Sequence, residues 1–183
     1  EITELSPNKI ANLGIARTFQ NIRLFNSMSV LENVLVGMHN SMNVNIIDII
    51  LKTKNFKKEE KLKREKAEKL LEYTGLVKYT NNRASSLPYG YQRRLEIARA
   101  LATSPSLLVI DEPAAGMNQK ETFDLKDFLD KINSDGTSIL IIEHDVKLIM
   151  NLCSFVTVLD FGKIICEGVP EMVKKNKNVI EAY

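Results

Sequence analysis

Two largely apolar runs stand out in the second half of the sequence, at residues 106–110 and 137–142. Short runs without polar alternation are typical of strands that are covered on both faces. Between them, residues 120–132 repeat apolar side chains at helical spacing, which predicts an amphipathic helix. Its buried face is predicted to comprise Phe123, Phe128, Leu129 and Ile132. A strand, a helix and a second strand in this order predict an α/β fold with a parallel sheet.

The last part of the chain continues this alternation with a predicted helix over residues 145–152. Residues 155–159 and 163–166 then alternate apolar and polar side chains around a turn at residues 160–162. This pattern predicts a β-hairpin. A short helix with basic residues is expected from Pro170 onward.

The first half is predicted to be mostly helical after one short strand at residues 14–19. Ser29 and Glu32 have the spacing of a capping box, in which each side chain binds a free backbone amide at the start of a helix. Gly75 is expected to end a helix. Further helices are predicted at residues 40–51, 54–73 and 90–103.

Charge adds little to this picture. The 183 residues carry a formal net charge of +2, which gives no reason to expect nucleic-acid binding. The charged run at residues 54–73 interleaves acids with bases and is therefore predicted to be a solvated helix face. Its predicted i,i+4 ion pairs are Glu59–Lys63, Glu60–Arg64 and Glu65–Lys69. Cys153 and Cys166 form no CxxC pair and are predicted to be buried free thiols, although the sequence leaves a disulfide open.

Polar residues that could do chemistry follow the predicted strands. Asp111 and Glu112 end one strand, and ligands of open α/β sheets bind beyond the carboxyl ends of the strands. A carboxylate there can hold Mg²⁺, and an adjacent acid can polarise an attacking water. His144 ends the next strand and could contact a phosphate, while Gln20 follows the first strand and could contact a metal ion or the water. The alternatives are acids that only cap a turn, a structural histidine and an amide without a role.

Gly90 is predicted to open a helix. A helix N-terminus presents free amide groups and a partial positive charge, which suit a phosphate group. The alternative for this residue alone is a loop-to-helix glycine with no ligand.

The order and spacing of these features resemble those of ABC-type ATPases. The match to the Q-loop is Gln20, and the match to the signature motif is the helix at Gly90. The Walker B strand is matched by the strand that ends in Asp111 and Glu112, and the H-loop by His144. The resemblance covers nearly the whole chain. Within that superfamily, the sequence is most similar to the ATP-binding subunit of branched-chain amino-acid importers. The segments that carry this similarity are Gly-Ile-Ala-Arg-Thr-Phe-Gln-Asn (14–21), Leu-Glu-Asn-Val (31–34), Leu-Pro-Tyr-Gly (87–90), Arg-Arg-Leu-Glu-Ile-Ala-Arg (93–99) and Asp-Glu-Pro-Ala-Ala-Gly-Met-Asn (111–118).

The resemblance implies a role for each of these residues in the hydrolysis of ATP with Mg²⁺. Asp111 would hold Mg²⁺, and Glu112 would be the general base. Gln20 would contact Mg²⁺, the attacking water and a membrane partner, and His144 would contact the γ-phosphate. Asn118 would lie in the D-loop, which runs between subunits. The residues that would complete the nucleotide site of an opposite subunit are Pro88, Tyr89, Gly90 and Tyr91.

The signature motif departs from the common superfamily sequence Leu-Ser-Gly-Gly-Gln. Pro88 replaces the Ser, Tyr89 the first Gly and Tyr91 the Gln. No Ser hydroxyl is available for a γ-phosphate, and proline has no N–H to donate. Phosphate contact is therefore expected from backbone groups around Gly90. Asn118 stands where many D-loops have Asp.

The 183 residues contain no P-loop. None of the eight glycines begins the run Gly-x-x-x-x-Gly-Lys-Ser/Thr, whose amides and lysine cradle phosphates. Because the P-loop precedes the Q-loop in this family, the sequence is expected to be a carboxy-terminal portion of such an ATPase. Taken alone, this portion is expected to bind ATP poorly and to be catalytically weak or inactive.

The expected architecture is the parallel-sheet core of an ABC-type ATPase, incomplete at its N-terminus, with an inserted helical subdomain. Residues 1–26 would form a core strand and the Q-loop. Residues 27–103 would form the helical subdomain with the signature motif. Residues 104–183 would form the rest of the core, with the Walker B strand, the D-loop, the H-loop, a hairpin and a C-terminal helix.

The resemblance also implies partners. A second ATPase subunit, identical or related, would form the dimer, and transmembrane permease subunits would hold it at the cytoplasmic face of a prokaryotic cell membrane. No apolar run approaches the ~20 residues that span a bilayer, so membrane association is expected to be indirect. The alternatives are a lipopolysaccharide-export ATPase and a non-catalytic interaction fragment.

Overall fold

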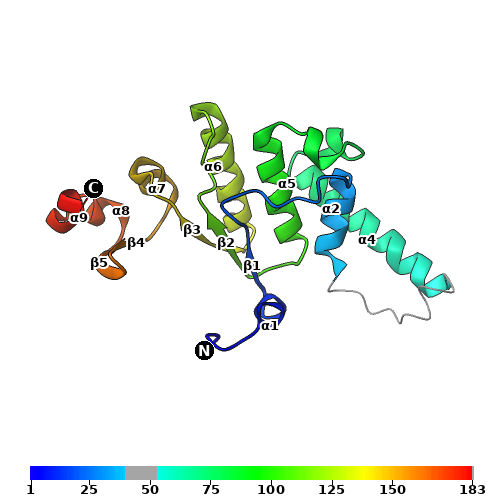
Figure 1. Cartoon of the computed structure of the whole chain (residues 1–183), viewed down its shortest axis with the longest axis horizontal. Coiled ribbons are helices and arrows are strands. Elements are labelled where there is room, and N and C mark those ends of the chain that lie inside the picture. The colour runs from blue at the N-terminus through cyan, green and yellow to red at the C-terminus, as the bar shows by residue number, and fades with distance from the viewer. Residues whose placement is uncertain (40–52, 183) are drawn as a thin grey trace. The chain divides into compact units, whose positions relative to one another are not determined.

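The computed structural model describes residues 1–39 and 53–182, in two compact units, Glu1–Ile141 and Ile142–Tyr183 (Figure 1). The sheet consists of β1 (Ile15–Arg17), β2 (Leu107–Asp111) and β3 (Ser138–Ile142), in that spatial order. β1 and β2 run parallel. The predicted α/β fold with a parallel sheet is therefore confirmed, while the division at residues 26 and 103 stays a prediction.

The first unit contains more helix than strand, as predicted. Its helices are α1 (Pro7–Asn12), α2 (Val30–Gly37), α4 (Lys54–Tyr73), α5 (Tyr89–Leu101) and α6 (Gln119–Ser134), with 3₁₀ turns η2 (Val77–Tyr79) and η3 (Ala84–Ser86). The helix predicted at residues 40–51 lies outside the described residues.

Local signals place two helix ends as the sequence predicts. Ser29 and Glu32 form both hydrogen bonds of the capping box at the start of α2. After α4, Gly75 adopts φ +74°, and the N–H of Leu76 donates to the carbonyl oxygen of Leu71 at 2.7 Å. A glycine in this conformation turns the chain out of the helix without a steric penalty.

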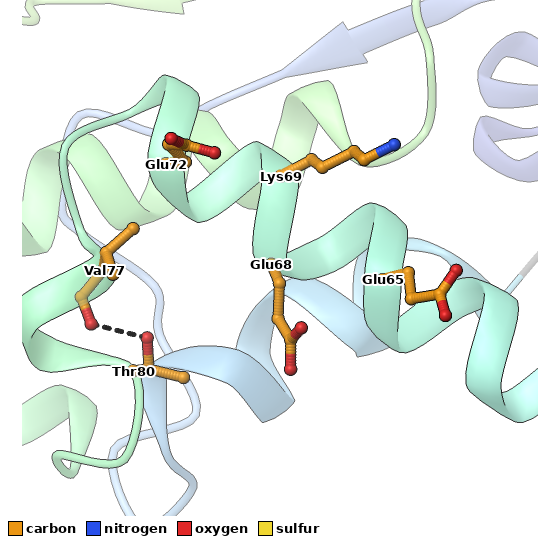
Figure 2. Close-up of a pocket in the computed structure, with 6 residues that line it drawn as sticks. All are labelled: Glu65, Glu68, Lys69, Glu72, Val77 and Thr80. Atoms are coloured by element: carbon orange, nitrogen blue, oxygen red, sulfur yellow. Dashed lines mark hydrogen bonds between the residues drawn. The ribbon is translucent and has the colours of Figure 1, made fainter.

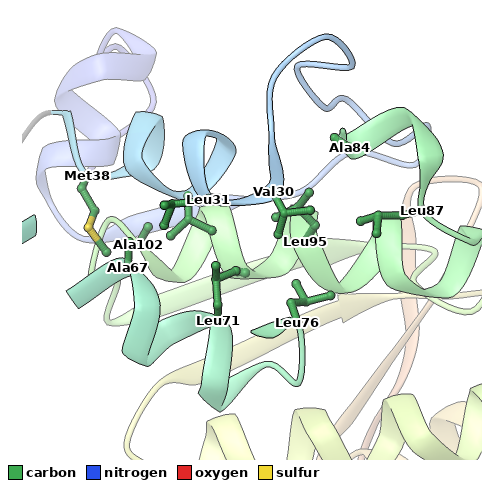
Figure 3. Close-up of a cluster of buried hydrophobic side chains, with 12 residues drawn as sticks. Val30, Leu31, Met38, Ala67, Leu71, Leu76, Ala84, Leu87, Leu95 and Ala102 are labelled. Atoms are coloured by element: carbon green, nitrogen blue, oxygen red, sulfur yellow. The ribbon is translucent and has the colours of Figure 1, made fainter. Parts of the chain in front are cut away.

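α2, α4 and α5 enclose one hydrophobic core (Figure 3). Leu95 and Ala98 of α5 are buried, as is its C-cap Ala102, while Leu101 is only half-buried. The other buried members are Val30, Leu31, Val34, Met38, Ala67, Leu71, Leu76, Ala84 and Leu87. This core fixes α5, whose N-terminal end carries the signature residues.

The ion pairs on α4 differ from those predicted. Lys61 pairs with Glu65 and Arg64 with Glu68. Lys63 is instead buried, and its Nζ donates to the carbonyl oxygen of Met38 at 2.8 Å. Lys63 lies one turn before the buried Ala67, so its stem packs against α2 while its ammonium group reaches the end of that helix. Burial lowers the pKa of Lys63.

Two burial predictions for the second half were wrong. Phe123 is 62% exposed, and Leu125 takes its place on the buried face of α6. Leu125 shares i,i+3 and i,i+4 spacing with Phe128 and Leu129, whereas Phe123 projects from another side of the helix. β3 is not fully covered, because Leu140 and other alternate residues of this strand are exposed.

The second unit contains the predicted hairpin. β4 (Val156–Asp160) pairs antiparallel with β5 (Lys163–Gly168), after α7 (Val146–Leu152). Two short helices, α8 (Pro170–Val173) and α9 (Lys177–Ala182), replace the single predicted one.

The two cysteines are free and only half-buried. Burial raises the pKa of the Cys153 thiol. Within residues 1–39 and 53–182, no helix combines the length and the apolar character needed to cross a bilayer.

Candidate functional site

The two predicted acids lie where a buried strand ends. Leu108 and Ile110 of β2 are fully buried, and Asp111 is the last residue of the strand. Glu112 follows with φ +44°, a left-handed conformation that is uncommon for a residue with a side chain. The chain therefore turns sharply at Glu112, and such outliers concentrate at functional sites.

Gln20 and Glu112 are brought into direct contact. β1 and β2 are parallel neighbours, so the segments after their carboxyl ends meet at one edge of the sheet. Across that edge, Nε2 of Gln20 donates to Oε2 of Glu112 at 2.7 Å. The structure thus joins two of the predicted site residues that are 92 positions apart.

Asp111 has a partner that the sequence did not reveal. Nη2 of Arg17, the last residue of β1, lies 3.1 Å from Oδ2 of Asp111. The Arg17 side chain is 58% exposed and that of Asp111 is 21% exposed, so solvent screens this ion pair and it contributes little stability. Arg17 was part of a recognised segment, but only the pairing of β1 with β2 brings it to Asp111.

The signature helix begins one residue earlier than predicted. Pro88 is the N-cap of α5, and its carbonyl oxygen accepts from the N–H groups of Tyr91 and Gln92, each at 3.0 Å. Tyr89 and Gly90 therefore occupy the first turn, where backbone N–H groups have no acceptor within the helix. A β-carbon on Gly90 would lie 3.5 Å from Oε1 of Glu121, so this turn faces the start of α6.

The two signature tyrosines make packing contacts. The ring of Tyr91 lies 4.9 Å from that of Tyr79, measured between the ring centroids. The pKa of Tyr79 is raised, first by burial and then by its interaction with Tyr91. The ring of Tyr89 lies over Gly116, in the segment that follows the two acids. These contacts connect the signature turn with its neighbours in the fold.

Asn118, the predicted D-loop residue, is the N-cap of α6. Its Oδ1 accepts from the N–H of Glu121 at 3.0 Å, and its own N–H donates to Oε2 of Glu121 at 2.9 Å. These two bonds form a capping box. A role between subunits stays a prediction.

His144 lies in the second unit. Its backbone N–H donates to Oε2 of Glu143 at 3.3 Å, and the following residue, Asp145, caps α7. The predicted contact of His144 with a γ-phosphate stays a prediction.

A buried ion pair on α5 was also missed. Nη1 of Arg93 lies 2.9 Å from Oε2 of Glu96, and the two side chains are 0% and 1% exposed. Both residues lie in a segment that carries the family resemblance, but charged residues in a helix are usually solvated, so nothing in the sequence signals their burial.

The donor set at this edge suits Mg²⁺. One or two carboxylates and waters are the usual protein share of a Mg²⁺ site, and phosphate oxygens supply the rest. Asp111 with the nearby amide of Gln20 is such a set, and within the described residues no cluster of three or more His, Cys, Asp or Glu forms a fuller site. The 183 residues do not supply a phosphate cradle of the P-loop type, because they contain no glycine-rich run ending in Lys-Ser/Thr.

A groove of about 590 Å³ between α4 and the residues around η2 is a separate feature (Figure 2). Its lining is Glu65, Glu68, Lys69, Glu72, Val77 and Thr80. It contains none of the predicted site residues, and its mostly acidic lining does not suit a phosphate ligand.

Comparison with known proteins places this arrangement in a family. Residues 2–115 match the family described as ABC transporter. The chain is 44% identical to the high-affinity branched-chain amino acid transport ATP-binding protein BraF of Pseudomonas aeruginosa, over 100% of this chain and 72% of BraF. It is 42% identical to LivG of Escherichia coli K12, over 98% of this chain and 71% of LivG.

A solved structure agrees with these sequence relatives. The ADP conformation of MJ1267, an ATP-binding cassette of an ABC transporter, superposes with a TM-score of 0.82 at 33% identity. The superposition covers 100% of this chain and 72% of MJ1267. The chain with the Gln20–Glu112 contact and the signature helix α5 therefore belongs to the ABC transporter family, among its ATP-hydrolysing cassettes.

Proposed function

We propose that this chain belongs to the ATP-binding and hydrolysing subunit of an ABC importer for branched-chain amino acids. The contact between Gln20 and Glu112 carries the proposal, because it places an amide donor on the carboxylate expected to act on water. BraF and LivG, which are similar over nearly the whole chain, are named for branched-chain amino acid transport and support this substrate class.

In this proposal Glu112 accepts a proton from the attacking water as general base. Gln20 donates to the Glu112 carboxylate and so fixes its direction. Asp111 and the amide oxygen of Gln20 would hold Mg²⁺, which neutralises phosphate charge when bound. His144 would contact the γ-phosphate.

The signature residues serve the opposite subunit in this proposal. The first-turn amides of Tyr89 and Gly90 point out of α5, whose N-terminus carries a partial positive charge. They would meet the phosphates of a nucleotide held by a second ATPase subunit, with Pro88 and Tyr91 setting the turn. Asn118 would lie beside them in the D-loop.

The membrane partner would be a pair of transmembrane permease subunits, with the ATPase dimer on the cytoplasmic face. The segment from Gln20 to Val30 and the helices after it would meet the permease. Phe25 in this segment is 47% exposed. We expect a photocrosslinker at residue 25 to react with the permease. If no position of this segment crosslinks to the permease, the proposed interface is wrong.

The decisive test is ATP-driven uptake by the complete transporter in proteoliposomes. The Glu112→Gln variant is expected to retain ATP binding but to lose uptake of labelled leucine together with ATP hydrolysis, by about 10²–10⁴-fold. Glu60→Gln, an exposed acid on α4, is the control and should behave as wild type. Wild-type transporter that hydrolyses ATP without moving any branched-chain amino acid would overturn the substrate assignment.

A separate experiment concerns residues 1–183 alone. Because these residues contain no P-loop, we expect calorimetry to detect no micromolar binding of Mg-ATP, and we expect negligible turnover. Micromolar affinity with steady hydrolysis would show that other groups of this chain can cradle the phosphates.

A further inference from the structure

The buried ion pair of α5 holds the loop that follows β1. Nη1 of Arg93 donates to the carbonyl oxygen of Phe19 at 2.8 Å, and Nη2 donates to that of Gln20 at 2.9 Å. Oε1 of Glu96 accepts from the N–H of Arg23 at 3.2 Å. Two side chains on one face of a helix thus bind three backbone groups between residues 19 and 23.

These bonds replace secondary structure in that loop. Residues 18–25 belong to no helix or strand, so their backbone groups need other partners. A guanidinium presents its donors in a rigid fork, which lets Arg93 span two consecutive carbonyl oxygens while it also binds Glu96. Lysine has a single ammonium group and cannot match this geometry.

The pair is poorly explained by stability alone. Burying two charges costs several kcal/mol per ion, and apolar residues of similar volume are often as stabilising or more so. The Nε of Arg93 is buried and has no hydrogen-bond partner within the described part of the chain. The hydrogen bonds of the pair serve the loop rather than the helix, which points to a role in placing that loop.

The loop in turn places a site residue. The backbone of Gln20 is bound by Arg93, and its side chain is bound to Glu112. Arg93 is one turn along α5 from Tyr89, whose hydroxyl lies 3.5 Å from Nη2. A continuous set of contacts therefore runs from the signature turn through Arg93 and Gln20 to Glu112.

We propose that Arg93 and Glu96 are a positioning pair that couples the seating of the signature helix to the orientation of Gln20 on Glu112. The inference rests on the proposed function, because it assigns Glu112 to the attacking water. When α5 is displaced, the fork leaves the carbonyl oxygens of Phe19 and Gln20, and the amide of Gln20 loses its fixed direction. Hydrolysis in one subunit thereby depends on how its own signature helix is seated.

The test replaces the pair by apolar residues in the complete transporter. In Arg93→Met/Glu96→Leu, both charges are removed together, so thermal stability is expected to stay near that of the wild type. The kcat for ATP is expected to fall about 10–100-fold, as for other residues that orient a reacting group through a second one. The KM for ATP should stay within about twofold, because ground-state binding is untouched.

Hydrogen exchange provides a readout that does not depend on turnover. In the same variant, exchange of the Arg23 amide and its neighbours in residues 19–24 is expected to quicken about tenfold, as for the loss of one hydrogen bond. Hydrogen exchange of the α5 amides should not change. A stable double variant with wild-type kcat and wild-type exchange would show that the pair only fills space, and would overturn the inference.

Two further variants keep the test decisive if the double variant does not fold. Arg93→Lys keeps the charge beside Glu96 but loses the fork, so a folded protein with lowered kcat is expected, and wild-type kcat would overturn the inference. Arg94→Lys is the matched control on the same helix. Arg94 donates to the carbonyl oxygen of Asp124 and lies over the ring of Phe128, away from residues 19–23, so its kcat should be unchanged.

Failure of the inference can be told apart from failure of the proposed function. A wild-type transporter that hydrolyses no ATP would remove the proposed function. Hydrogen exchange of residues 19–24 in the same preparation would still decide whether Arg93 and Glu96 hold the loop.

Discussion

Nε2 of Gln20 lies 2.7 Å from Oε2 of Glu112, although 92 positions separate the two residues. The contact forms because each residue follows one of two adjacent parallel strands, β1 and β2. The amide of Gln20 donates to one carboxylate oxygen of Glu112 and so constrains the direction of the carboxylate group. Gln20 is therefore expected to orient Glu112, and substitutions at position 20 test this directly.

Gln20→Ala is expected to lower the kcat for ATP about 10–100-fold in the complete transporter, since it removes the group that orients Glu112. The KM for ATP should change little, and steady-state kinetics separates the two effects. Asn178→Ala, which removes an exposed amide on α9, is the control. Equal kcat in the two variants would contradict an orienting role for Gln20.

Arg17→Gln is expected to lower the Mg²⁺ concentration needed for half-maximal ATP hydrolysis. Arg17 pairs with Asp111, the proposed Mg²⁺ ligand, and its charge opposes that of the metal ion. Because Arg17 is well exposed, the expected change is only a few-fold. Arg64→Gln removes an equally exposed partner of Glu68 and should have no effect. A raised Mg²⁺ requirement in Arg17→Gln would mean that the arginine supports the metal site.

Asn118→Ala is expected to lower the free energy of unfolding by about 1 kcal/mol, because it removes the N-cap of α6. Asn118→Asp keeps an oxygen that can accept from the Glu121 amide and should retain stability. Denaturant unfolding measures both. Equal losses in the two variants would show that the amide nitrogen of Asn118, rather than its oxygen, is what matters.

Gly37→Ala is expected to be strongly destabilising, by about 1–3 kcal/mol or more from overpacking. A β-carbon on Gly37 would lie 2.4 Å from the backbone oxygen of Arg99 and 2.9 Å from the β-carbon of Ala102, so α2 and α5 would have to separate. Gly90→Ala is a helical control for thermal stability, since its nearest neighbour would be 3.5 Å away. A similar melting temperature for both variants would contradict close packing of these helices.

Tyr73→Phe is expected to lower the free energy of unfolding by about 1 kcal/mol at neutral pH, because the Tyr73 hydroxyl donates to Oδ2 of Asp135 at 2.7 Å. Burial, followed by the hydrogen bond and charge of Asp135, raises the pKa of Tyr73 above its ordinary value.

The sign of the pH effect follows from that shift. A raised pKa means that the folded protein keeps the proton longer than the unfolded chain, so the advantage of Tyr73 is complete below about pH 10 and is lost at higher pH. The difference between wild type and Tyr73→Phe should therefore shrink above pH 10 in denaturant titrations. A difference that stays constant from pH 7 to 11 would contradict this linkage.

Several features could be predicted because they depend on near neighbours in the chain. The capping box at Ser29, the end of α4 at Gly75 and the hairpin after α7 are set by bonds within a few residues. The site motifs were recognised from residue order and spacing for the same reason. Predictions failed where the answer depended on which side of an element meets the core, as for Phe123 and for Lys63.

The sequence by itself determined the family, the types of most elements, and the positions of Gln20, Pro88–Tyr91, Asp111, Glu112 and Asn118 along the chain. Only the tertiary structure decided that Gln20 binds Glu112 and that Arg17 binds Asp111. It also decided that Arg93 and Glu96 of α5 are buried against the loop that follows β1. The physical reason is that a motif fixes spacing along the backbone. Contacts between segments some 70 to 90 positions apart arise only when strands pair and helices pack.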